Sequence, residues 1–415
     1  MFSSYPFKIC DPIHGFIRFE EIIQKIINSL PFQRLRYIHQ MGAAFLVYPG
    51  ATHTRFEHSL GVMELVTRIY NTLIAPHHLK VHLPDVDFDY WRLILRCAAL
   101  CHDLGHLPFS HTAEKSLLPP GGHEKITIAM IRSPRLRPIW QELEARFGPH
   151  VEDDIIKLSV QEEELKELKT GLELNAWEKM LSQIITEDNF GADRIDYLVR
   201  DARYTGTGYG HFDYHQLIDC LRILPSLKKE GEFALGVSAS GIQSVEALWI
   251  ARYMMYARVY QHGKCRVFSN HLERFMTKFY KGKISTDLED YLAEVDAVII
   301  AELIHAAKRG DRDAACLLKM EPAFSELALE EREEKPLLPH LQQLKEAFQE
   351  KIFIDDQFQK NKNREFPVLM EEGRVLSSYQ VSPFLRDIPL GGKALRLFVE
   401  RASLPLVKEW IAKRI

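Results

Sequence analysis

The sequence has 415 residues, of which 46% are hydrophobic and 27% are charged. These proportions are ordinary for a folded globular protein and exclude a wholly disordered, fibrous or collagen-like chain. The net charge of −4 argues against a protein that coats DNA or RNA, because such proteins carry a basic surface. We therefore do not expect nucleic acid as a partner.

Helical periodicity dominates the first two thirds of the chain. It predicts helices over residues 57–73, 90–103, 160–174 and 184–202, and a long helix or helix pair over 246–274. The segment 90–103 is almost wholly apolar and should be buried on nearly all sides. Gly105 marks its end, and the Pro-Pro-Gly-Gly segment 119–122 predicts a loop.

Strand signals are few. Alternation over residues 233–239 predicts one strand, and residues 366–370 and 374–381 predict a hairpin. Acidic residues and prolines over 321–339 indicate a surface connection. We expect a mainly α fold, with a helical domain over 1–285 and a smaller mixed α/β region over 286–415 that provides an interface or a lid.

Cysteine usage and the N-terminal residues bear on the compartment. The six cysteines form no Cys-x-x-Cys pair, so neither a zinc ribbon nor a redox dithiol is indicated. Residues 1–8 lack a signal-peptide pattern, and no run of about 18 apolar residues is present to span a membrane. We expect a cytoplasmic protein with no membrane partner.

Histidines are concentrated in one part of the sequence. Ten of the 18 histidines lie between His39 and His123. Imidazoles and carboxylates together are common ligands of divalent metals. His102 and Asp103 follow an apolar helix, where a buried carboxylate is costly unless a cation compensates it. A His-Asp pair alone is more often a helix end than a metal site, but His58 upstream and Asp193 downstream strengthen the metal hypothesis.

The order His58, His102-Asp103, Asp193 resembles the HD-domain metal-dependent phosphohydrolases. Further segments are similar to the SAM- and HD-domain deoxynucleoside triphosphate triphosphohydrolases and their bacterial relatives, namely 11–15, 32–38, 53–61, 101–111, 196–202 and 260–262. The resemblance covers roughly residues 6–280 and implies an HD-domain helical core. The sequence has no room for an N-terminal SAM domain, so we expect the HD-only bacterial type.

The resemblance implies a metal centre and catalytic side chains. The implied ligands of one divalent metal ion are His58, His102, Asp103 and Asp193. Two imidazoles and two carboxylates leave a position open for water or a phosphate oxygen, and they suit Fe, Mn, Zn, Ni or Mg. The implied catalytic residues are His123 as general acid, Glu114 as its support where the family usually has Asp, and His106 and His111 as phosphate-contacting or water-positioning groups.

The implied substrate is a deoxynucleoside triphosphate. Three arginines stand at the family's phosphate-binding positions, with Arg194 where Lys is more usual: Arg55, Arg194 and Arg252. Gln40 and Asp201 are the implied partners of the 3′-hydroxyl, and Tyr197 closes the space at the 2′ position. Met41, Tyr260 and Gln261 are expected to flank the sugar and the base.

Some members of the family form active tetramers when a nucleotide binds at a second, regulatory site. Several positions of that site in the vertebrate protein differ here, namely Asn28, Gln216, Ser238, Ser240 and Gly263, whereas Gln33 and Arg36 are kept. We predict that vertebrate-type nucleotide activation is absent or altered. The resemblance implies a homodimer or a homotetramer.

The sequence thus predicts metal-dependent hydrolysis of deoxynucleoside triphosphates to deoxynucleoside and inorganic triphosphate. One alternative is the same metal site acting on another phosphoester, such as a nucleoside monophosphate or an alarmone. The candidate deoxyribose residues argue against it. The other alternative is a nucleotide-binding regulator without turnover. The presence of all four candidate ligands and the candidate acid argues against this one.

Overall fold

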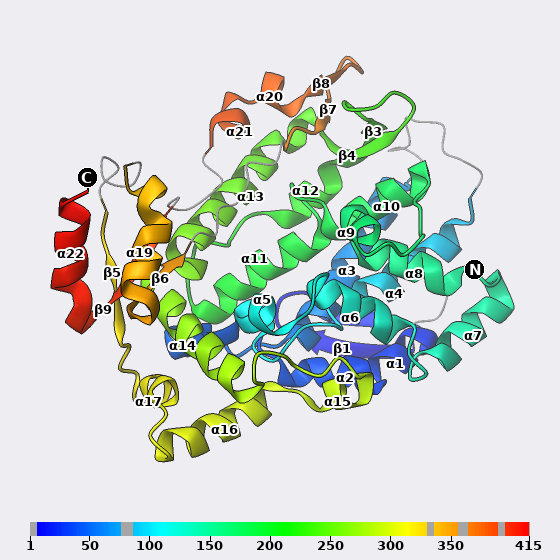
Figure 1. Cartoon of the computed structure of the whole chain (residues 1–415). Helices are drawn as coiled ribbons and strands as arrows, with labels where there is room; N and C mark the ends of the chain where they lie inside the picture. Colours follow the sequence, from blue (N-terminus) through cyan, green and yellow to red (C-terminus); the bar gives the residue numbers. More distant parts are fainter. Residues whose placement is uncertain (1–5, 76–85, 330–335, 356–363, 389–394, 415) are drawn as a thin grey trace.

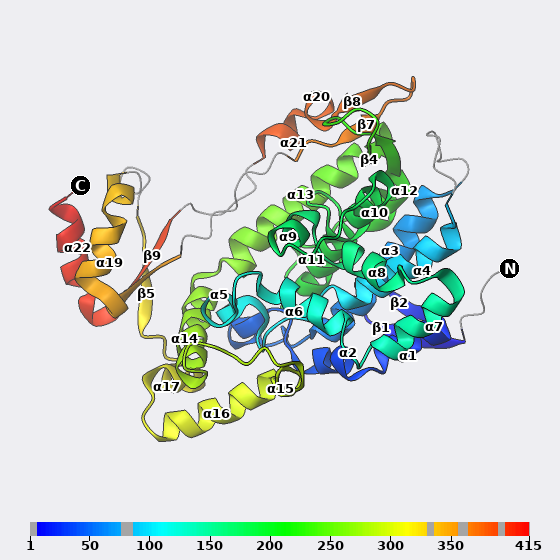
Figure 2. The ribbon, with the colours of Figure 1, turned by 45° about the vertical axis from the view of Figure 1, so that its right-hand side comes forward.

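The computed structural model describes residues 6–75, 86–329, 336–355, 364–388 and 395–414. Most of these residues form helices packed into one large body, and a small sheet with two helices lies beside α14 (Gly263–Phe279) at one end of it (Figures 1 and 2). The prediction of a mainly α fold with a smaller mixed C-terminal region is confirmed.

The first half of the chain builds the helical body around an N-terminal hairpin that the sequence pattern did not predict. The hairpin pairs β1 (Phe7–Asp11) with β2 (Gly15–Phe19). The helices that follow are α1 (Glu21–Ile27), α2 (Leu30–Arg34), α3 (Arg55–Leu73), α4 (Phe88–Cys101), α5 (Glu114–Leu117), α6 (Gly122–Ile131), α7 (Arg137–Phe147), α8 (Val151–Ser159), α9 (Glu162–Glu167), α10 (Ala176–Thr186) and α11 (Ala192–Thr205).

Helices α3 and α4 confirm the predictions for residues 57–73 and 90–103. The N–H of Thr54 donates to Glu57 Oε1 at 2.8 Å, which caps the start of α3. Helix α4 is buried along most of its length, as its apolar sequence requires, and it ends at Cys101. The residues after it turn, so His102 and Asp103 lie at the helix end.

Two other helix predictions were wrong in part. The single helix predicted over 184–202 is interrupted, because the Glu187 carboxylate accepts hydrogen bonds from the N–H groups of Asn189 and Phe190 and so ends α10. This break places Asp193 in the first turn of α11. Of the helix predicted over 160–174 only α9 forms, and the chain then turns at Lys169, whose φ is +52°.

The second half of the chain continues the body and adds a four-stranded sheet. Its helices are α12 (Tyr214–Cys220), α13 (Ile242–Met255), a π-helix over Tyr256–Tyr260, α14, α15 (Leu288–Ala293), α16 (Asp296–Lys308) and α17 (Arg312–Lys319). The sheet order is β3 (Leu221–Pro225), β4 (Phe233–Ser238), β7 (Pro367–Leu369) and β8 (Val375–Ser377). The predicted strand is present as β4, and the predicted hairpin forms as β7 and β8. Its second strand was predicted to extend to residue 381, which is wrong, because Ser377 caps a helix, α20 (Ser378–Val381), that begins at the next residue; α21 (Pro383–Asp387) follows.

The small sheet and its helices are called the C-terminal module below. It consists of β5 (Phe324–Leu327), β6 (Ile352–Asp355) and β9 (Arg396–Glu400) with α19 (Leu341–Phe348) and α22 (Leu404–Ala412). Strand β9 lies between the other two and is antiparallel to both. Strand β5 lies within the segment predicted as a surface connection, of which residues 330–335 are outside the described ranges.

The main hydrophobic core continues beyond residue 285. It includes Tyr291, Ile299 and Leu317, and it reaches Phe366 and Leu385 near the four-stranded sheet. The C-terminal module has a smaller core of its own. The predicted boundary at residue 285 stays a prediction. Within the described ranges, no helix combines the length and the apolar character that crossing a membrane requires.

Candidate active site

Four side chains from three helices meet at one point, where His58 and Asp103 are buried and Asp193 is the most exposed. His58 lies in the first turns of α3, His102 and Asp103 at the end of α4, and Asp193 in the first turn of α11. His58 Nε2 is 3.0 Å from Asp193 Oδ1 and 3.6 Å from Asp103 Oδ2. His102 Nε2 is 3.4 Å from Asp103 Oδ1 and 3.8 Å from Asp193 Oδ1. These four residues are called the metal quartet.

Hydrogen bonds at Nδ1 fix both imidazoles of the quartet, on the side of each ring opposite the quartet's carboxylates. His58 Nδ1 is 2.8 Å from Asp196 Oδ2, and His102 Nδ1 is 2.8 Å from the carbonyl oxygen of Ala99. When Nδ1 carries the proton, the lone pair is on Nε2. Both Nε2 atoms are buried without a hydrogen bond, and each faces the carboxylates of the quartet.

The chemistry of this donor set fits a divalent metal ion. Ligand atoms of His58, His102 and Asp103 lie within 4.8 Å of one another. Burial opposes a charge on His58, but Asp193 and Asp196 outweigh that effect and raise its pKa to about 10, so this point favours a positive charge, which a metal ion in place of the Nε2 proton would supply. Arg55 and His102 hold the pKa of Asp103 well below its usual range despite burial. A cation between the carboxylates and the two unpaired nitrogens would satisfy all four side chains.

A buried network behind the quartet was missed by sequence reasoning. Asp196 bonds His14 Nε2 at 2.7 Å and Arg200 Nε at 2.8 Å, in addition to His58. Arg200 Nη1 also donates to Asp11 Oδ2 at 2.8 Å. The segments 11–15 and 196–202 carried the resemblance, but no role was assigned to these side chains. The available signal was the spacing of Asp196 and Arg200, four residues apart on one helix face.

A second group, called the histidine cluster, lies beside the quartet: His106, His111, Glu114 and His123. His106 links the two groups, because its Nε2 is 3.1 Å from Asp103 Oδ1. The rings of His106 and His123 stack with centroids 3.8 Å apart, and His111 packs edge-on against both. Glu114 Oε1 is 2.6 Å from His123 Nδ1, and Glu114 Oε2 is 2.7 Å from His111 Nδ1.

The local backbone explains how Glu114 reaches His123. Gly122 has φ +50°, and a Cβ at this position would lie only 2.5 Å from Glu114 Oε1. The glycine therefore makes room for the carboxylate, which also accepts the backbone N–H of His123 at 2.9 Å. Burial opposes a charge on His123, but Glu114 outweighs that effect and raises its pKa. Burial and the nearby Arg55 place the pKa of His106 well below its usual range.

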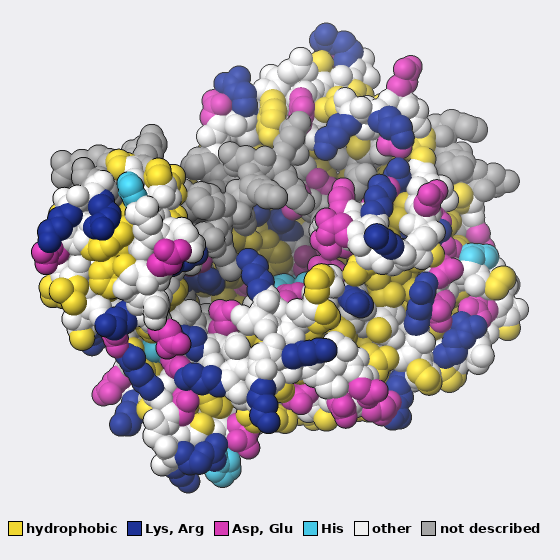
Figure 3. Space-filling model, viewed as in Figure 1, with side chains coloured by type: hydrophobic (Ala, Val, Ile, Leu, Met, Phe, Trp, Pro, Cys, Tyr) yellow, Lys and Arg dark blue, Asp and Glu magenta, His cyan; other side chains and the backbone are white. Residues whose placement is uncertain are grey.

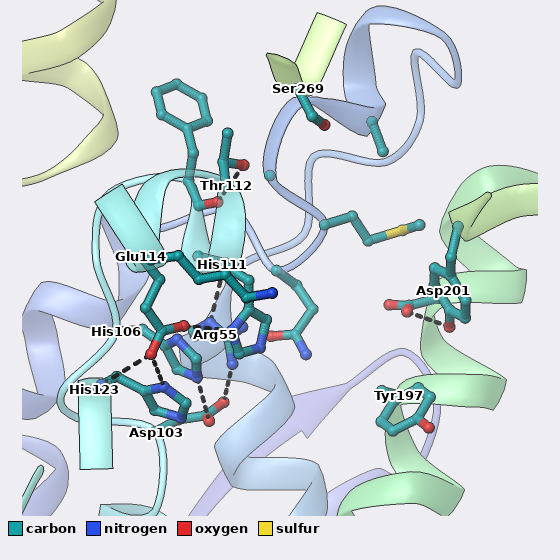
Figure 4. Close-up of a pocket in the computed structure, with 18 of the residues that line it drawn as sticks. Arg55, Asp103, His106, His111, Thr112, Glu114, His123, Tyr197, Asp201 and Ser269 are labelled. Atoms are coloured by element: carbon teal, nitrogen blue, oxygen red, sulfur yellow. Dashed lines mark hydrogen bonds and ion pairs between the residues drawn. The ribbon is translucent and has the colours of Figure 1, made fainter. Parts of the chain in front are cut away.

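A cavity of about 960 Å³ opens over both groups. Figure 3 shows its mouth as a hollow between the C-terminal module and the helical body. Figure 4 shows the histidine cluster on one side of the cavity, with Tyr197 and Asp201 of α11 across from it. The predicted site residues that line it are Gln40, Met41, Arg55, His102, Asp103, His106, His111, Glu114, His123, Asp193, Tyr197, Asp201, Tyr260 and Gln261.

The side of the cavity opposite the histidine cluster is built around Asp201. This carboxylate is 2.7 Å from His53 Nε2 and accepts a hydrogen bond from Tyr260 Oη at 2.6 Å. Tyr197 lies edge-on to Tyr260, with ring centroids 6.3 Å apart. Gln40 Oε1 is buried without a hydrogen-bond partner. The fixed carboxylate and the amide offer polar contacts to a hydroxyl group, and the tyrosines restrict the space around it.

The three predicted phosphate-binding arginines lie in different surroundings. Arg55 lines the cavity but donates to Asp103 Oδ2 at 2.6 Å and to Ser110 Oγ at 2.8 Å. Arg194 is held by Asp188 and by Tyr197 Oη at 3.2 Å. The Arg252 guanidinium lies 5.2 Å from the centre of the Tyr256 ring. Arg194 and Arg252 are not part of the cavity wall as it stands.

Sequence reasoning also missed part of the cavity wall. The missed residues include Tyr256, Arg266 and Asn270 from the π-helix and α14, and Phe353, Ile354 and Asp355 from β6. Strand β6 belongs to the C-terminal module, for which the sequence offered no chemistry. No pattern near the β6 residues indicated a site, and β6 is placed by its pairing with β9, a strand about 40 residues further along the chain.

The helical body and its His/Asp quartet define a protein of the metal-dependent hydrolase class. A model of the HD domain matches residues 55–198, and a model of the HD-associated region matches residues 215–319. The crystal structure of a hypothetical protein from Aquifex aeolicus is similar over 97% of this chain and 99% of that one, with 32% identity and a TM-score of 0.70. This chain belongs to the family of HD-domain phosphohydrolases that carry an HD-associated region.

Two curated relatives are longer proteins that match this chain over part of their own length. An uncharacterized protein from Methanocaldococcus jannaschii is 34% identical over 300 residues, which are 72% of this chain and 55% of that protein. The deoxynucleoside triphosphate triphosphohydrolase SAMHD1 of Homo sapiens is 28% identical over 346 residues, which are 75% of this chain and 53% of that enzyme. The chain thus spans about half the length of the curated relatives it matches.

Proposed function

We propose that this phosphohydrolase converts deoxynucleoside triphosphates to the deoxynucleoside and inorganic triphosphate. The observation that carries the proposal is the meeting of three groups in one cavity: the metal quartet, the histidine cluster, and the polar side around Asp201. The name of the human relative adds support, since that protein is a deoxynucleoside triphosphate triphosphohydrolase. A homodimer or homotetramer stays a prediction.

The metal quartet would hold one divalent cation, and its ligands suit Fe, Mn, Zn, Ni or Mg. When bound, such an ion supplies Lewis-acid stabilisation of the phosphate charge and lowers the pKa of a water molecule. The protein contributes fixed ligand orientation, because Asp196 and the Ala99 carbonyl hold the two imidazoles from behind. Asp193 is the most exposed ligand and lies at the cavity wall.

The histidine cluster would handle the proton of the leaving group. Attack of a water molecule on the α-phosphorus would form a new phosphorus–oxygen bond, release the water's proton and break the bond to the 5′-oxygen. The 5′-oxygen leaves as an alkoxide that needs a proton. His123 is the proposed donor, since Glu114 bonds its Nδ1 and favours its protonated form, and its Nε2 is then free to donate. His106, kept neutral, would bridge between Asp103 and the reacting phosphate. His111 is exposed and shares Glu114.

The polar side of the cavity would select the sugar. We propose that Asp201 and Gln40 bind the 3′-hydroxyl, since the carboxylate is already oriented by His53 and Tyr260. Tyr197 would leave no space for a 2′-hydroxyl, so ribonucleotides would be rejected. Met41 and Gln261 would contact the sugar edge or the base. Arg55, Arg194 and Arg252 would contribute positive charge to a triphosphate, with Arg55 also neutralising Asp103.

The product of the reaction tests the proposal. Purified protein supplied with a divalent metal and each dNTP in turn should release inorganic triphosphate and deoxynucleoside. Release of pyrophosphate or of inorganic monophosphate would instead assign cleavage to a phosphoanhydride bond of the triphosphate. Binding of dNTP without turnover by metal-loaded protein would favour a regulator. Ribonucleoside triphosphates serve as the matched control, because they differ only at the 2′ position that Tyr197 is proposed to close.

A further inference from the structure

The C-terminal module contacts the helical body at the start of α14. Phe353 of β6, Phe324 of β5 and Phe398 of β9 form a small apolar cluster with Val267 of α14. The Phe353 and Phe398 rings stack with centroids 4.4 Å apart. Figures 1 and 2 show the module beside α14, away from the rest of the body. The module is therefore fixed mainly at this end of the cavity.

Arg396, the first residue of β9, reaches from the module to the cavity turn, defined here as residues 261–263. Its Nη1 donates to the carbonyl oxygen of Gln261, and its Nε donates to Glu326 Oε1 at 2.9 Å. Arg396 is only 8% exposed, whereas its partner Glu326 is exposed to solvent. A planar guanidinium can bind a carboxylate and a carbonyl together in fixed geometry.

Gly263 leaves room for this contact. A Cβ at this position would lie 2.9 Å from Glu326 Oε2 and 3.3 Å from Arg396 Nη2. The glycine thus lets the Arg396–Glu326 pair approach the backbone between the π-helix and α14. Gln261 lies between those two helices, and its N–H donates to the Tyr256 carbonyl at 3.0 Å. Its own carbonyl projects toward the module, where Arg396 binds it.

A second link lies one turn further along α14. Arg266 Nε and Nη2 donate to the two carboxylate oxygens of Asp355 at 2.6 and 3.0 Å. Both residues line the cavity, together with Phe353 and Ile354. The module therefore supplies one wall of the cavity and also holds the turn that follows Tyr260. A shift of the module would move the wall and the turn together.

We propose that Arg396 is a positioning residue, through which the C-terminal module sets the placement of Gln261 and Tyr260 in the substrate cavity. The inference rests on the proposed function, in which Gln261 contacts the nucleotide and Tyr260 orients the Asp201 carboxylate. Arg396 touches no reacting atom, so its loss should weaken nucleotide binding and leave the chemical step intact. The module thereby acquires a role in substrate binding rather than in assembly alone.

The test compares two arginines in ion pairs at opposite ends of β9: Arg396, the first residue of the strand, and Arg312 of α17, which pairs with Glu400, the last residue of the strand. Arg396→Ala removes the link to the cavity turn, whereas Arg312→Ala removes the exposed Arg312–Glu400 ion pair at the far end of the strand. For each dNTP, Arg396→Ala should raise KM by roughly tenfold or more with kcat within about twofold, because a turn displaced by about 1 Å loses binding contacts. Arg312→Ala should change neither, and Arg396→Lys should recover only part of the loss.

Hydrogen exchange gives a readout that does not need turnover. The amides of Gln261 and His262 bond the carbonyls of Tyr256 and Val259, and they should exchange faster in Arg396→Ala than in Arg312→Ala. If wild-type protein hydrolyses no dNTP, the proposed function fails, while the exchange comparison still decides the role of Arg396. If Arg396→Ala does not fold, Glu326→Gln replaces it. Equal exchange and equal KM in the two arginine variants would overturn the inference.

Discussion

His58 Nδ1 and Asp196 Oδ2 are joined by a 2.8 Å hydrogen bond that is buried on all sides. This bond fixes the ring of His58 so that Nε2 faces Asp193 and Asp103. Asp196 is itself held by Arg200 and His14, so the orientation of a metal ligand depends on residues from the N-terminal hairpin region and from α11. The metal quartet is thus prepared by the fold before any ion binds.

Asp196→Asn should weaken metal affinity by about 10–100-fold, because the amide no longer fixes the His58 tautomer. It should also destabilise the fold by about 3–5 kcal/mol, since Arg200 loses a buried partner. Bound metal is measured by mass spectrometry of the dialysed protein, and stability by urea unfolding. Asp154→Asn is the control, because Asp154 is also buried but bonds Tyr90 away from the cavity. Equal metal loss in both variants would count against a specific role for Asp196.

His102→Ala and Asp103→Ala should both abolish metal binding and turnover, but they should differ in stability. The His102 side chain bonds the carbonyl oxygen of Ala99 besides its place in the quartet. Asp103 also pairs with buried Arg55, so its removal leaves an uncompensated cation that costs about 3–5 kcal/mol. Thermal unfolding of the metal-free proteins measures the difference. Substantial turnover by either variant in metal-free buffer would contradict the metal mechanism.

Glu114→Gln should reduce kcat by about 100-fold and change its pH dependence. Glu114 raises the pKa of His123, so the amide variant should have a lower pKa at that imidazole. A general acid must be protonated, and the rate therefore falls as pH rises through its pKa. The alkaline limb of the kcat profile should move to lower pH in the variant. An unchanged alkaline limb would mean that another group donates the proton.

Asp313 should contribute to stability above about pH 4 and lose that contribution in acid. Burial opposes its charge, but His271 and Lys278 outweigh this effect and lower its pKa to about 2. The folded-state pKa is thus below the unfolded value of about 3.9, so stabilisation of about 2 kcal/mol is present above the unfolded pKa and is lost as pH falls. Asp313→Asn should lower the free energy of unfolding at pH 5. The difference between wild type and variant should be roughly half as large at pH 3. A loss independent of pH would refute this account.

The sequence predicted the local features of the fold better than the distant ones. Periodicity located α3, α4 and α11 because each has a continuous buried face. It did not foresee the break at Glu187, which depends on a side chain capping its own backbone. The C-terminal module was also beyond reach, because β9 pairs with strands that precede it by about 40 and 70 residues in the chain.

The candidate site shows the same division. The order of His58, His102, Asp103 and Asp193 indicated a metal site, and the structure brings these side chains together. The pattern could not predict the hydrogen bonds that orient these ligands, such as those of Asp196. In a sequence, a buried carboxylate on a helix cannot be told from an ordinary surface charge. Nor could it place β6 at the cavity, since no residue there has a distinctive type or spacing.

The central claim is that the metal quartet binds one ion, and anomalous X-ray scattering tests it most directly. Crystals soaked in manganese chloride should give a single strong anomalous peak among His58 Nε2, His102 Nε2 and the carboxylates of Asp103 and Asp193. The absence of an anomalous peak at the quartet, or an ion bound elsewhere in the cavity, would contradict the account.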